Sequence, residues 1–386
     1  MIQGYVHPDF ADVAIALRST LRHKRGGGGA AAVYHRGEKV VDIWSGTRDD
    51  DGRPWEEDTV AMSWSTTKGV VATAAHRLID RGELDVDAPV AEYWPEFKAA
   101  GKEDVRVANL LDHSAGMHRV RGVIESAEML FEWDRTVDAL AAAPAAYPAG
   151  TKHGYHALTY GFLVGEVLRR VTGLSSVNEI VEREVAAPLG IEAGLHIGAT
   201  GAVRDRVATL LTSWPDQAKA DRFVARMDRW GWLQPAIDAF MISGDLPATI
   251  ASGAVYDAEV PALNGVFSAR SLARMYAAIS LGGTLDGVKL LSPEAVNRAG
   301  TVRTRSRDIV IGWPMRWRLG YHMAATSRGV RPNGFGHFGL GGSGAWADLD
   351  LGLSVAMTCN RMAGTPFGDQ RMLKVGAAAV KSARAR

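Results

Sequence analysis

Cysteine is almost absent from this sequence. Its one cysteine, Cys359, cannot form an internal disulfide, and it cannot supply the several thiolates of a common structural zinc site. Cys359 follows the strand-like run at residues 355–358, so we expect a thiol packed in the interior. Disulfide scaffolds and cysteine-based zinc domains are therefore excluded.

An excess of charge of either sign is also missing. The chain carries 44 Lys and Arg against 43 Asp and Glu, interspersed along its length, so we expect no nucleic-acid and no membrane partner. No run of about eighteen apolar residues occurs, which argues against a membrane span. The first ten residues lack the basic and apolar regions of a secretory signal. We therefore expect a cytoplasmic protein, and nothing in the sequence indicates its oligomeric state.

A nucleotide-binding loop is absent as well. The glycine run at residues 26–29 lacks the G-K-[ST] ending of a phosphate loop, and a strand-like rather than a helical pattern follows it. We therefore expect no nucleotide and no other cofactor.

The order of hydrophobic patterns along the 386 residues predicts the architecture. Strand-like patterns stand at both ends of the chain, at residues 30–34, 39–44, 316–323, 334–338, 345–349 and 353–359. Helical patterns occupy residues 9–25, much of 65–184, 269–281, 293–299 and 370–384. The simplest α+β arrangement is one antiparallel sheet built from both chain ends and flanked by the terminal helices, with a mainly helical domain inserted.

This arrangement divides the chain into two domains. Residues 1–63 and 262–386 would form the sheet-containing domain, and residues 64–261 the helical one, with a site between them. The stretch at about 199–261 is the least regular, and it is rich in aromatic side chains, among them Trp214, Trp230, Trp232 and Phe240. These aromatics would either wall a binding cleft or fill a core, and the sequence leaves both open.

The most informative motif is the S-x-x-K tetrapeptide from Ser65 to Lys68. An apolar stripe at residues 70–79 and Gly82 after it predict a helix that begins at this motif. On a helix, residues three apart are surface neighbours, so the amine can reach the hydroxyl. A serine needs an adjacent base, and a buried neutral lysine can be that base. The alternative is a helix-capping serine followed by a solvated lysine.

Two further segments complete a candidate site. Tyr155 follows the loop at residues 144–154, and its phenolate would act as a base if Lys68 lowered the tyrosine pKa. The glycine-rich run at residues 336–342 would let the backbone approach a ligand, so one of its amides could share an oxyanion hole with Ser65. Alone, these segments also fit a helix-entry aromatic and a simple hairpin.

Together the motifs resemble those of serine hydrolases related to class C β-lactamases and penicillin-binding proteins, especially the family VIII carboxylesterases. S-x-x-K is the nucleophile motif of that group. The similar blocks occur in the same order along the chain, at residues 58–64, 84–90, 94–97, 109–117, 155–157, 337–339 and 346–348.

The resemblance implies specific roles. Ser65 would form an acyl-enzyme, Lys68 and Tyr155 would share proton transfer, and the amides of Ser65 and Leu340 would form the oxyanion hole. The substrate-binding segment would consist of three consecutive residues, His337, Phe338 and Gly339.

Two departures from the lactamase pattern point to the substrate. His337 replaces the lysine that holds a substrate carboxylate, and Ala157 replaces an asparagine. A neutral histidine does not replace that positive charge at pH 7. We therefore expect a carboxylesterase for short acyl esters.

Several alternatives remain beside the esterase. On the same scaffold they are a β-lactamase or D-amino-acid peptidase, and an acyltransferase. A metal hydrolase would use His153 with His156, or Asp112, His113 and His118, but no recognised ligand motif occurs, so we expect no metal. A non-catalytic scaffold remains a further possibility. An α/β-hydrolase is excluded because the sequence contains no G-x-S-x-G.

Overall fold

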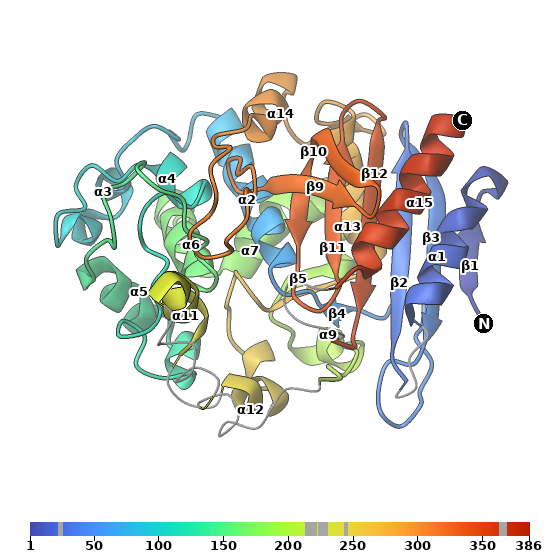
Figure 1. Cartoon of the computed structure of the whole chain (residues 1–386), viewed down its shortest axis with the longest axis horizontal. Coiled ribbons are helices and arrows are strands. Elements are labelled where there is room, and N and C mark those ends of the chain that lie inside the picture. The colour runs from blue at the N-terminus through green and yellow to red at the C-terminus, as the bar shows by residue number, and fades with distance from the viewer. Residues whose placement is uncertain (22–25, 213–221, 223–230, 243–245, 363–368) are drawn as a thin grey trace.

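The computed structural model describes residues 1–21, 26–212, 222, 231–242, 246–362 and 369–386. A large antiparallel sheet stands at one side of the molecule, and most of the helices gather at the other (Figure 1). The sheet order is β1-β3-β2-β12-β11-β10-β9. Its strands are β1 (Gln3–Val6), β2 (Gly28–His35), β3 (Glu38–Gly46), β9 (His322–Thr326), β10 (Gly329–Phe338), β11 (Gly344–Asp348) and β12 (Leu353–Cys359).

The two chain ends meet in the middle of this sheet, as the sequence predicts. β12 pairs with β2 from Leu353 opposite His35 to Cys359 opposite Gly29. β2 and β3 are joined by the two-residue turn Arg36-Gly37, in which both residues have positive φ. This left-handed pair matches the twist of the flanking strands. The predicted α+β fold with a sheet built from both ends is confirmed.

Alternating side chains of the central strands pack on two helical layers. Ala31 and Val33 face the terminal helices α1 (Ala11–Leu21) and α15 (Arg371–Ala385), whereas Ala32 and Tyr34 belong to the larger core on the other face. That other face is covered by α13 (Ala269–Ser280), which contacts β2, β11 and β12 (Figure 1). Successive side chains of a strand point to opposite faces of the sheet. Because both faces are buried here, the strands read as nearly continuous apolar runs.

The remaining helices lie on the other side of the sheet from α1 and α15 (Figure 1). They are α2 (Thr66–Asp80), α3 (Val90–Tyr93), α4 (Val107–Leu111), α5 (Trp133–Ala142), α6 (Thr159–Thr172), α7 (Val177–Val181), α8 (Ala187–Leu189), α9 (Gly201–Asp205), α11 (Gln234–Phe240), α12 (Leu246–Ala251) and α14 (Pro293–Gly300). A three-stranded sheet of β4 (Ala61–Met62), β6 (Gly265–Phe267) and β5 (Leu195–Ile197) joins the start of α2 to later segments. A short hairpin of β7 (Thr284–Leu285) and β8 (Val288–Lys289) follows α13.

Most predicted boundaries differ from the structure by one to three residues, but the strand predicted at residues 316–323 is wrong. β9 begins only at His322, because Arg318 and Tyr321 close a turn with Gly320 at φ 82°. Trp317 and Arg318 are both buried, so this run does not alternate between two faces. The predicted helix at 9–25 is observed as α1, and its last four residues lie outside the described part of the chain.

Two other expectations concern the end of the helix that begins at Ser65 and the absence of a membrane-spanning helix. Helix α2 ends where Gly82 takes a positive φ, which confirms the predicted stop. Among the residues described, none of the helices combines the length and the apolar character needed to cross a bilayer. The division into domains at residues 63 and 261 stays a prediction.

Candidate active site

Ser65 stands at the entry to α2, immediately after a strained residue. Trp64 is buried and has φ 52°, a left-handed conformation that bulky residues rarely adopt. Thr67 fixes this turn, since its Oγ1 donates to the Trp64 carbonyl at 2.5 Å and accepts from the Gly265 amide at 2.9 Å. The Ser65 hydroxyl makes no capping bond to the helix, so it is free for other chemistry.

The Lys68 amine lies beside this hydroxyl and is completely buried. Its Nζ is 3.1 Å from Ser65 Oγ, 2.8 Å from the Ala157 carbonyl and 2.9 Å from the Ala262 carbonyl. Burial holds the pKa of Lys68 well below its ordinary range. A neutral amine has two N–H groups, which the two carbonyls accept, and its lone pair then faces Ser65. The solvated lysine of the alternative interpretation is therefore wrong.

Tyr155, which lies shortly before α6, also contacts Ser65. Its hydroxyl donates to Ser65 Oγ at 2.7 Å, and Lys68 Nζ lies 4.9 Å from the centre of its ring. Burial raises the pKa of Tyr155 above its ordinary value. The phenolate expected from the sequence is therefore not the resting form, because burial penalises its charge and the phenol keeps its proton.

Two residues that the sequence analysis missed hold Tyr155 in place. The buried Asp308 accepts the amide of Tyr155 at 3.3 Å and the indole N–H of Trp317 at 2.8 Å. Trp317 stacks on the Tyr155 ring, with centres 5.5 Å apart and planes within 10°. Neither residue belongs to a local motif, and only the closed turn at 308–317 brings them to the site.

Two buried histidines, His113 and His156, lie next to the same tyrosine, and the ring of His113 contacts that of Tyr155. The Met117 amide donates to His156 Nε2 at 3.0 Å, which places the proton of neutral His156 on Nδ1, 3.2 Å from His113 Nδ1. The His156 amide also donates to His113 Nδ1, at 3.1 Å. Burial is the largest cause that holds the pKa values of both histidines well below their ordinary range.

These contacts also bear on the metal alternative. Both ring nitrogens of His156 and Nδ1 of His113 are already engaged by protein groups, so they do not point a shared set of lone pairs at one ion. Asp112 accepts from Ser114 and pairs with Arg303. Within the described ranges, no three His, Cys, Asp or Glu residues are grouped as metal ligands would be.

The end of β10 brings His337 and the glycine-rich run to the start of α2. Gly69 allows this close approach, because a Cβ on it would lie 3.2 Å from His337 Cβ. His337 is buried, its Nδ1 lies 3.1 Å from the Phe338 carbonyl, and its ring centre is 6.2 Å from that of Tyr155. Burial, the neighbouring His322 and Lys68 hold its pKa well below the ordinary value, so His337 carries no charge here.

Leu340 lies in the turn that follows β10. The Gly339 amide is used by the Ser343 carbonyl, and Gly339 packs so tightly on Ser63 that a Cβ would meet its carbonyl oxygen at 2.1 Å. In the part of the chain that the structure describes, the amides of Ser65 and Leu340 donate to no protein acceptor. The next carbonyl, that of Gly341, is held by the Arg371 guanidinium and by the Cys359 thiol.

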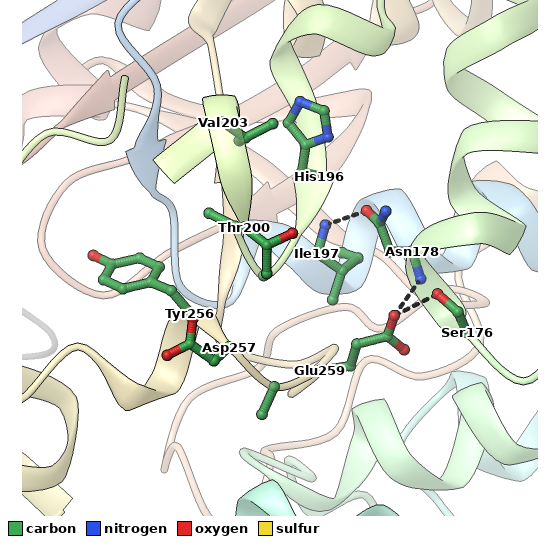
Figure 2. Close-up of a pocket in the computed structure, with 12 residues that line it drawn as sticks. Ser176, Asn178, His196, Ile197, Thr200, Val203, Tyr256, Asp257 and Glu259 are labelled. Carbon is green, nitrogen blue, oxygen red and sulfur yellow. Dashed lines mark hydrogen bonds between the residues drawn. The ribbon is translucent and has the colours of Figure 1, made fainter. Parts of the chain in front are cut away.

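A hollow of about 300 Å³ elsewhere in the structure contains none of these residues. Figure 2 shows its polar wall, where Glu259 points at the first residues of α7 and Asn178 points at Ile197. Glu259 accepts from Ser176 Oγ at 2.5 Å and from the Val177 amide at 2.7 Å, so it caps α7. Glu259 and Asn178 therefore tie neighbouring segments of the fold together.

Comparison with known proteins agrees with this architecture. The sequence is 39% identical over 366 residues to the Mycobacterium tuberculosis protein "Esterase/beta-lactamase LipL", covering 93% of this chain and 83% of the relative. A crystal structure of a family VIII carboxylesterase matches with a TM-score of 0.87 and 36% identity, over 99% of this chain and 100% of the other. A penicillin-binding protein homologue from Caulobacter crescentus matches with a TM-score of 0.85 and 32% identity, over 99% and 100%.

The family model described as "Beta-lactamase" matches residues 16–379, which include every residue of the site described above. The expected relation to β-lactamase-like serine hydrolases is thereby confirmed. On this match, and on the shared fold, the chain belongs to the beta-lactamase family.

Proposed function

We propose that the protein is a serine carboxylesterase that forms an acyl-enzyme on Ser65. The observation that carries the proposal is the convergence of two proton-handling groups on one hydroxyl, with Lys68 Nζ at 3.1 Å and Tyr155 Oη at 2.7 Å from Ser65 Oγ. A base and a proton donor that share one nucleophile are what acyl transfer requires. The names of the esterase relatives support the same assignment.

Acylation begins with proton transfer from Ser65 to neutral Lys68. Ser65 Oγ bonds to the ester carbonyl carbon, and the carbonyl oxygen becomes an oxyanion that the amides of Ser65 and Leu340 receive. When the carbon–oxygen bond to the alcohol breaks, Tyr155 gives its proton to the leaving oxygen. The proton on Lys68 then restores the Tyr155 phenol, so the alcohol leaves and both groups return to their starting forms.

Deacylation repeats these steps with water. Lys68 takes a proton from the attacking water, whose oxygen bonds to the acyl carbon. The bond to Ser65 Oγ breaks, and Lys68 returns the proton to Ser65 as the carboxylic acid is released. The cycle needs no cofactor, because every proton removed by Lys68 is returned in the same half-reaction.

The substrate preference follows from the residues around the nucleophile. His337 is neutral and the side chain of Ala157 is a methyl group, so neither side chain provides the cation or the amide donor that would hold a substrate carboxylate. Neutral esters of short acids lose nothing by this absence, whereas β-lactams and peptides lose their anchor. We therefore propose short-chain acyl esters as the substrates, with β-lactams as poor ones.

The test compares two chromogenic substrates on two proteins. Wild type should hydrolyse p-nitrophenyl butyrate much faster than a chromogenic cephalosporin, and Ser65→Ala should lose both activities. Mass spectrometry after rapid quenching should find one butyryl group on wild type and none on Ser65→Ala. Full ester turnover by Ser65→Ala would contradict the mechanism, and preferential cephalosporin turnover by wild type would reverse the substrate assignment.

Tyr155→Phe provides a second check on the same mechanism. Loss of the phenol should lower kcat about a hundredfold or more, the usual contribution of a positioned acid or base. An unchanged kcat in a folded Tyr155→Phe protein would show that the leaving alcohol takes its proton from another group.

A further inference from the structure

The segment that carries Tyr155 packs against two others, the turn at 308–317 and helix α11. Together the three segments form an apolar surface around Tyr155. Tyr155, Ala157, Ala239, Val310 and Trp317 form one buried cluster, with Ile309, Ile311 and Met315 partly buried against it. Backbone bonds fix the arrangement, since the Ile309 amide donates to the His153 carbonyl at 2.9 Å and the Val120 amide to the Asp238 carbonyl at 2.7 Å.

Two of these segments also carry exposed large aromatic side chains. Phe240, the last residue of α11, is 37% exposed, and its ring centre lies 6.2 Å from that of Tyr155. Trp313, on the turn at 308–317, is 62% exposed. Single exposed apolar residues are common, but here two of them stand on the two segments that pack against one site tyrosine.

The buried carboxylate next to this surface, that of Asp308, is already occupied. The carboxylate of Asp308 accepts the amides of Tyr155, Val310 and Ile311 as well as the indole N–H of Trp317. It is therefore not available to pair with a cationic or hydrogen-bonding group of a ligand. A ligand group that lies on this surface gains by burying apolar area.

The direction of the proposed reaction decides which part of an ester lies there. Tyr155 protonates the leaving oxygen, so the alcohol portion must extend from the Tyr155 hydroxyl. The oxyanion lies instead at the amides of Ser65 and Leu340, at the end of β10. We infer that the surface formed by Phe240, Ile309, Ile311 and Trp313 binds the alcohol portion of the ester, and that the enzyme prefers bulky apolar alcohols. This inference rests on the proposed function.

The experiment varies the alcohol and keeps the acid constant. Ethyl, cyclohexylmethyl and 2-(trimethylammonio)ethyl butyrate would be compared by kcat/KM on wild type, Phe240→Ser, Trp313→Ser and Ile15→Ser. Ile15 is a matched control, since it is an exposed apolar residue on α1, behind the sheet. A second series would vary the acid from acetate to octanoate with the alcohol held as ethanol.

Wild type should prefer the cyclohexylmethyl ester over the ethyl ester by about tenfold or more, and disfavour the cationic ester. Phe240→Ser should reduce that cyclohexylmethyl preference by about fivefold, the loss expected for part of one aromatic contact. Trp313→Ser should reduce it as well, and Ile15→Ser should not. Because Trp313 lies on a different segment, its result stands even if Phe240→Ser unfolds α11.

The other outcomes overturn the inference in distinguishable ways. Equal kcat/KM across the alcohols, with turnover still dependent on Ser65, would leave the esterase proposal intact and remove the alcohol site. If Phe240→Ser changed only the acid series, the surface would hold the acyl chain instead. Turnover of none of these esters by wild type would remove the proposed function itself.

Discussion

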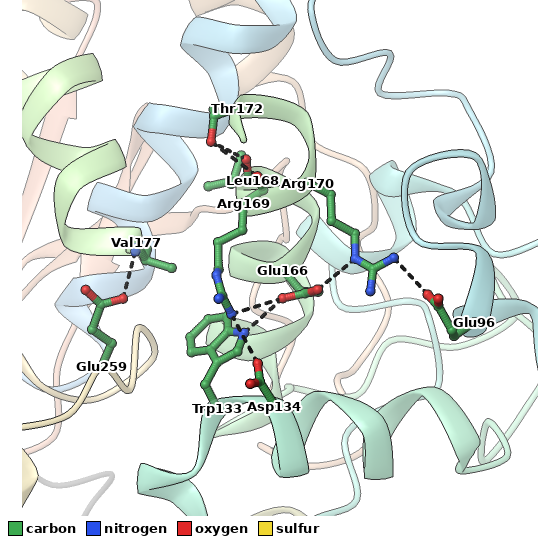
Figure 3. A network of polar contacts seen from close by, with 10 residues as sticks. All are labelled: Glu96, Trp133, Asp134, Glu166, Leu168, Arg169, Arg170, Thr172, Val177 and Glu259. Carbon is green, nitrogen blue, oxygen red and sulfur yellow. Dashed lines mark hydrogen bonds and ion pairs between the residues drawn. The ribbon is translucent and has the colours of Figure 1, made fainter. Parts of the chain in front are cut away.

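Two buried sites in this molecule treat charge in opposite ways. Glu166, on α6, is 7% exposed and is surrounded by two cations and one neutral donor: Arg170 at 2.7 Å, Arg169 at 3.3 Å and the Trp133 indole N–H at 2.9 Å. Figure 3 shows these side chains pointing at one carboxylate, with Arg170 reaching on to Glu96. Lys68 is fully buried and is surrounded by neutral oxygens.

The difference separates a group that stabilises from a group that the proposed mechanism uses as a base. A buried charge with hydrogen-bonded counter-ions stays charged and ties helices together. A buried amine without a counter-ion has a lowered pKa, because burial penalises its charged form. In the described ranges no carboxylate lies within ion-pair distance of Lys68. The neutral base of the proposed mechanism therefore depends on what surrounds the lysine.

The largest expected effect comes from forcing a charge into the Lys68 position. Lys68→Arg should lower kcat/KM for p-nitrophenyl butyrate by about a thousandfold or more, because a guanidinium does not deprotonate in proteins and so cannot act as the base. Lys68→Met, which has no base at all, should fall equally far. Near-normal turnover by either folded variant would show that another group deprotonates Ser65.

Lys102 provides a matched control for this experiment. It is also fully buried, and its amine also donates only to carbonyl oxygens, those of Ala99, Ala141 and Ala143. It has no serine beside it. Lys102→Met should therefore lose stability while kcat/KM of the folded protein stays within about threefold of wild type, the range expected without loss of a catalytic group.

A smaller effect, on stability rather than turnover, is expected at Glu166. Glu166→Gln keeps the shape of the side chain but removes the charge that Arg169 and Arg170 approach. The free energy of unfolding should fall by about 1–3 kcal/mol, as for a buried hydrogen-bonded charge that loses its partner. Urea unfolding measures this change, and kcat should stay near that of wild type.

The control for Glu166 is an exposed ion pair. Glu125 pairs with Arg135 at the surface, where its side chain is 71% exposed. Glu125→Gln should change the unfolding free energy by no more than about 0.5 kcal/mol. Equal losses for the two glutamates would mean that burial of the Glu166 network contributes nothing to stability.

The sequence reveals the reactive group more readily than its surroundings. Ser65 and Lys68 are three residues apart on one helix, so a local rule brings them together. For Tyr155 and the glycine-rich run, residue chemistry left simpler interpretations open, and the family resemblance joined them to Ser65, because no local rule does so. In the structure Lys68 and Tyr155 both contact the Ser65 hydroxyl, and the ring of His337, near the end of β10, lies 6.2 Å from that of Tyr155.

The parts of the site that the sequence did not predict were missed for a common physical reason. The Ala262 carbonyl reaches Lys68 because the turn before β6 is braced by Asn264, which donates to the Val255 and Ala258 carbonyls. Gly161 on α6 lets that turn approach, since a Cβ there would meet the Ala262 amide at 2.5 Å. Such contacts depend on tertiary packing, and a backbone carbonyl leaves no mark on the residue type that carries it.

The same holds for the aromatic region at 199–261. Phe240 lies against Tyr155, so at this residue the region borders the site rather than only filling a core. Trp232 is 73% exposed. Trp214 and Trp230 lie outside the described residues, and the prediction made for them stays open.

The last prediction measures the protonation state of Lys68 without using turnover. Because burial depresses the folded-state pKa, Lys68 loses its proton at a lower pH in the folded protein than in the unfolded chain, where its pKa is about 10.4. In the window between these two pKa values the unfolded state binds one more proton, so stability rises with pH by about 1.4 kcal/mol per unit. Lys68→Met lacks this titrating group. The unfolding free energy of wild type should therefore rise relative to that of Lys68→Met between pH 7 and pH 9.

Ser65→Ala is the control that separates the amine from the activity. It abolishes the nucleophile but leaves the buried lysine among its carbonyls, so its unfolding free energy should follow the pH dependence of wild type and not that of Lys68→Met. Parallel curves for all three proteins would mean that Lys68 keeps its proton in the folded state. In that case the amine could not accept the serine proton, and Lys68 would resemble the arginines around Glu166 more than a base.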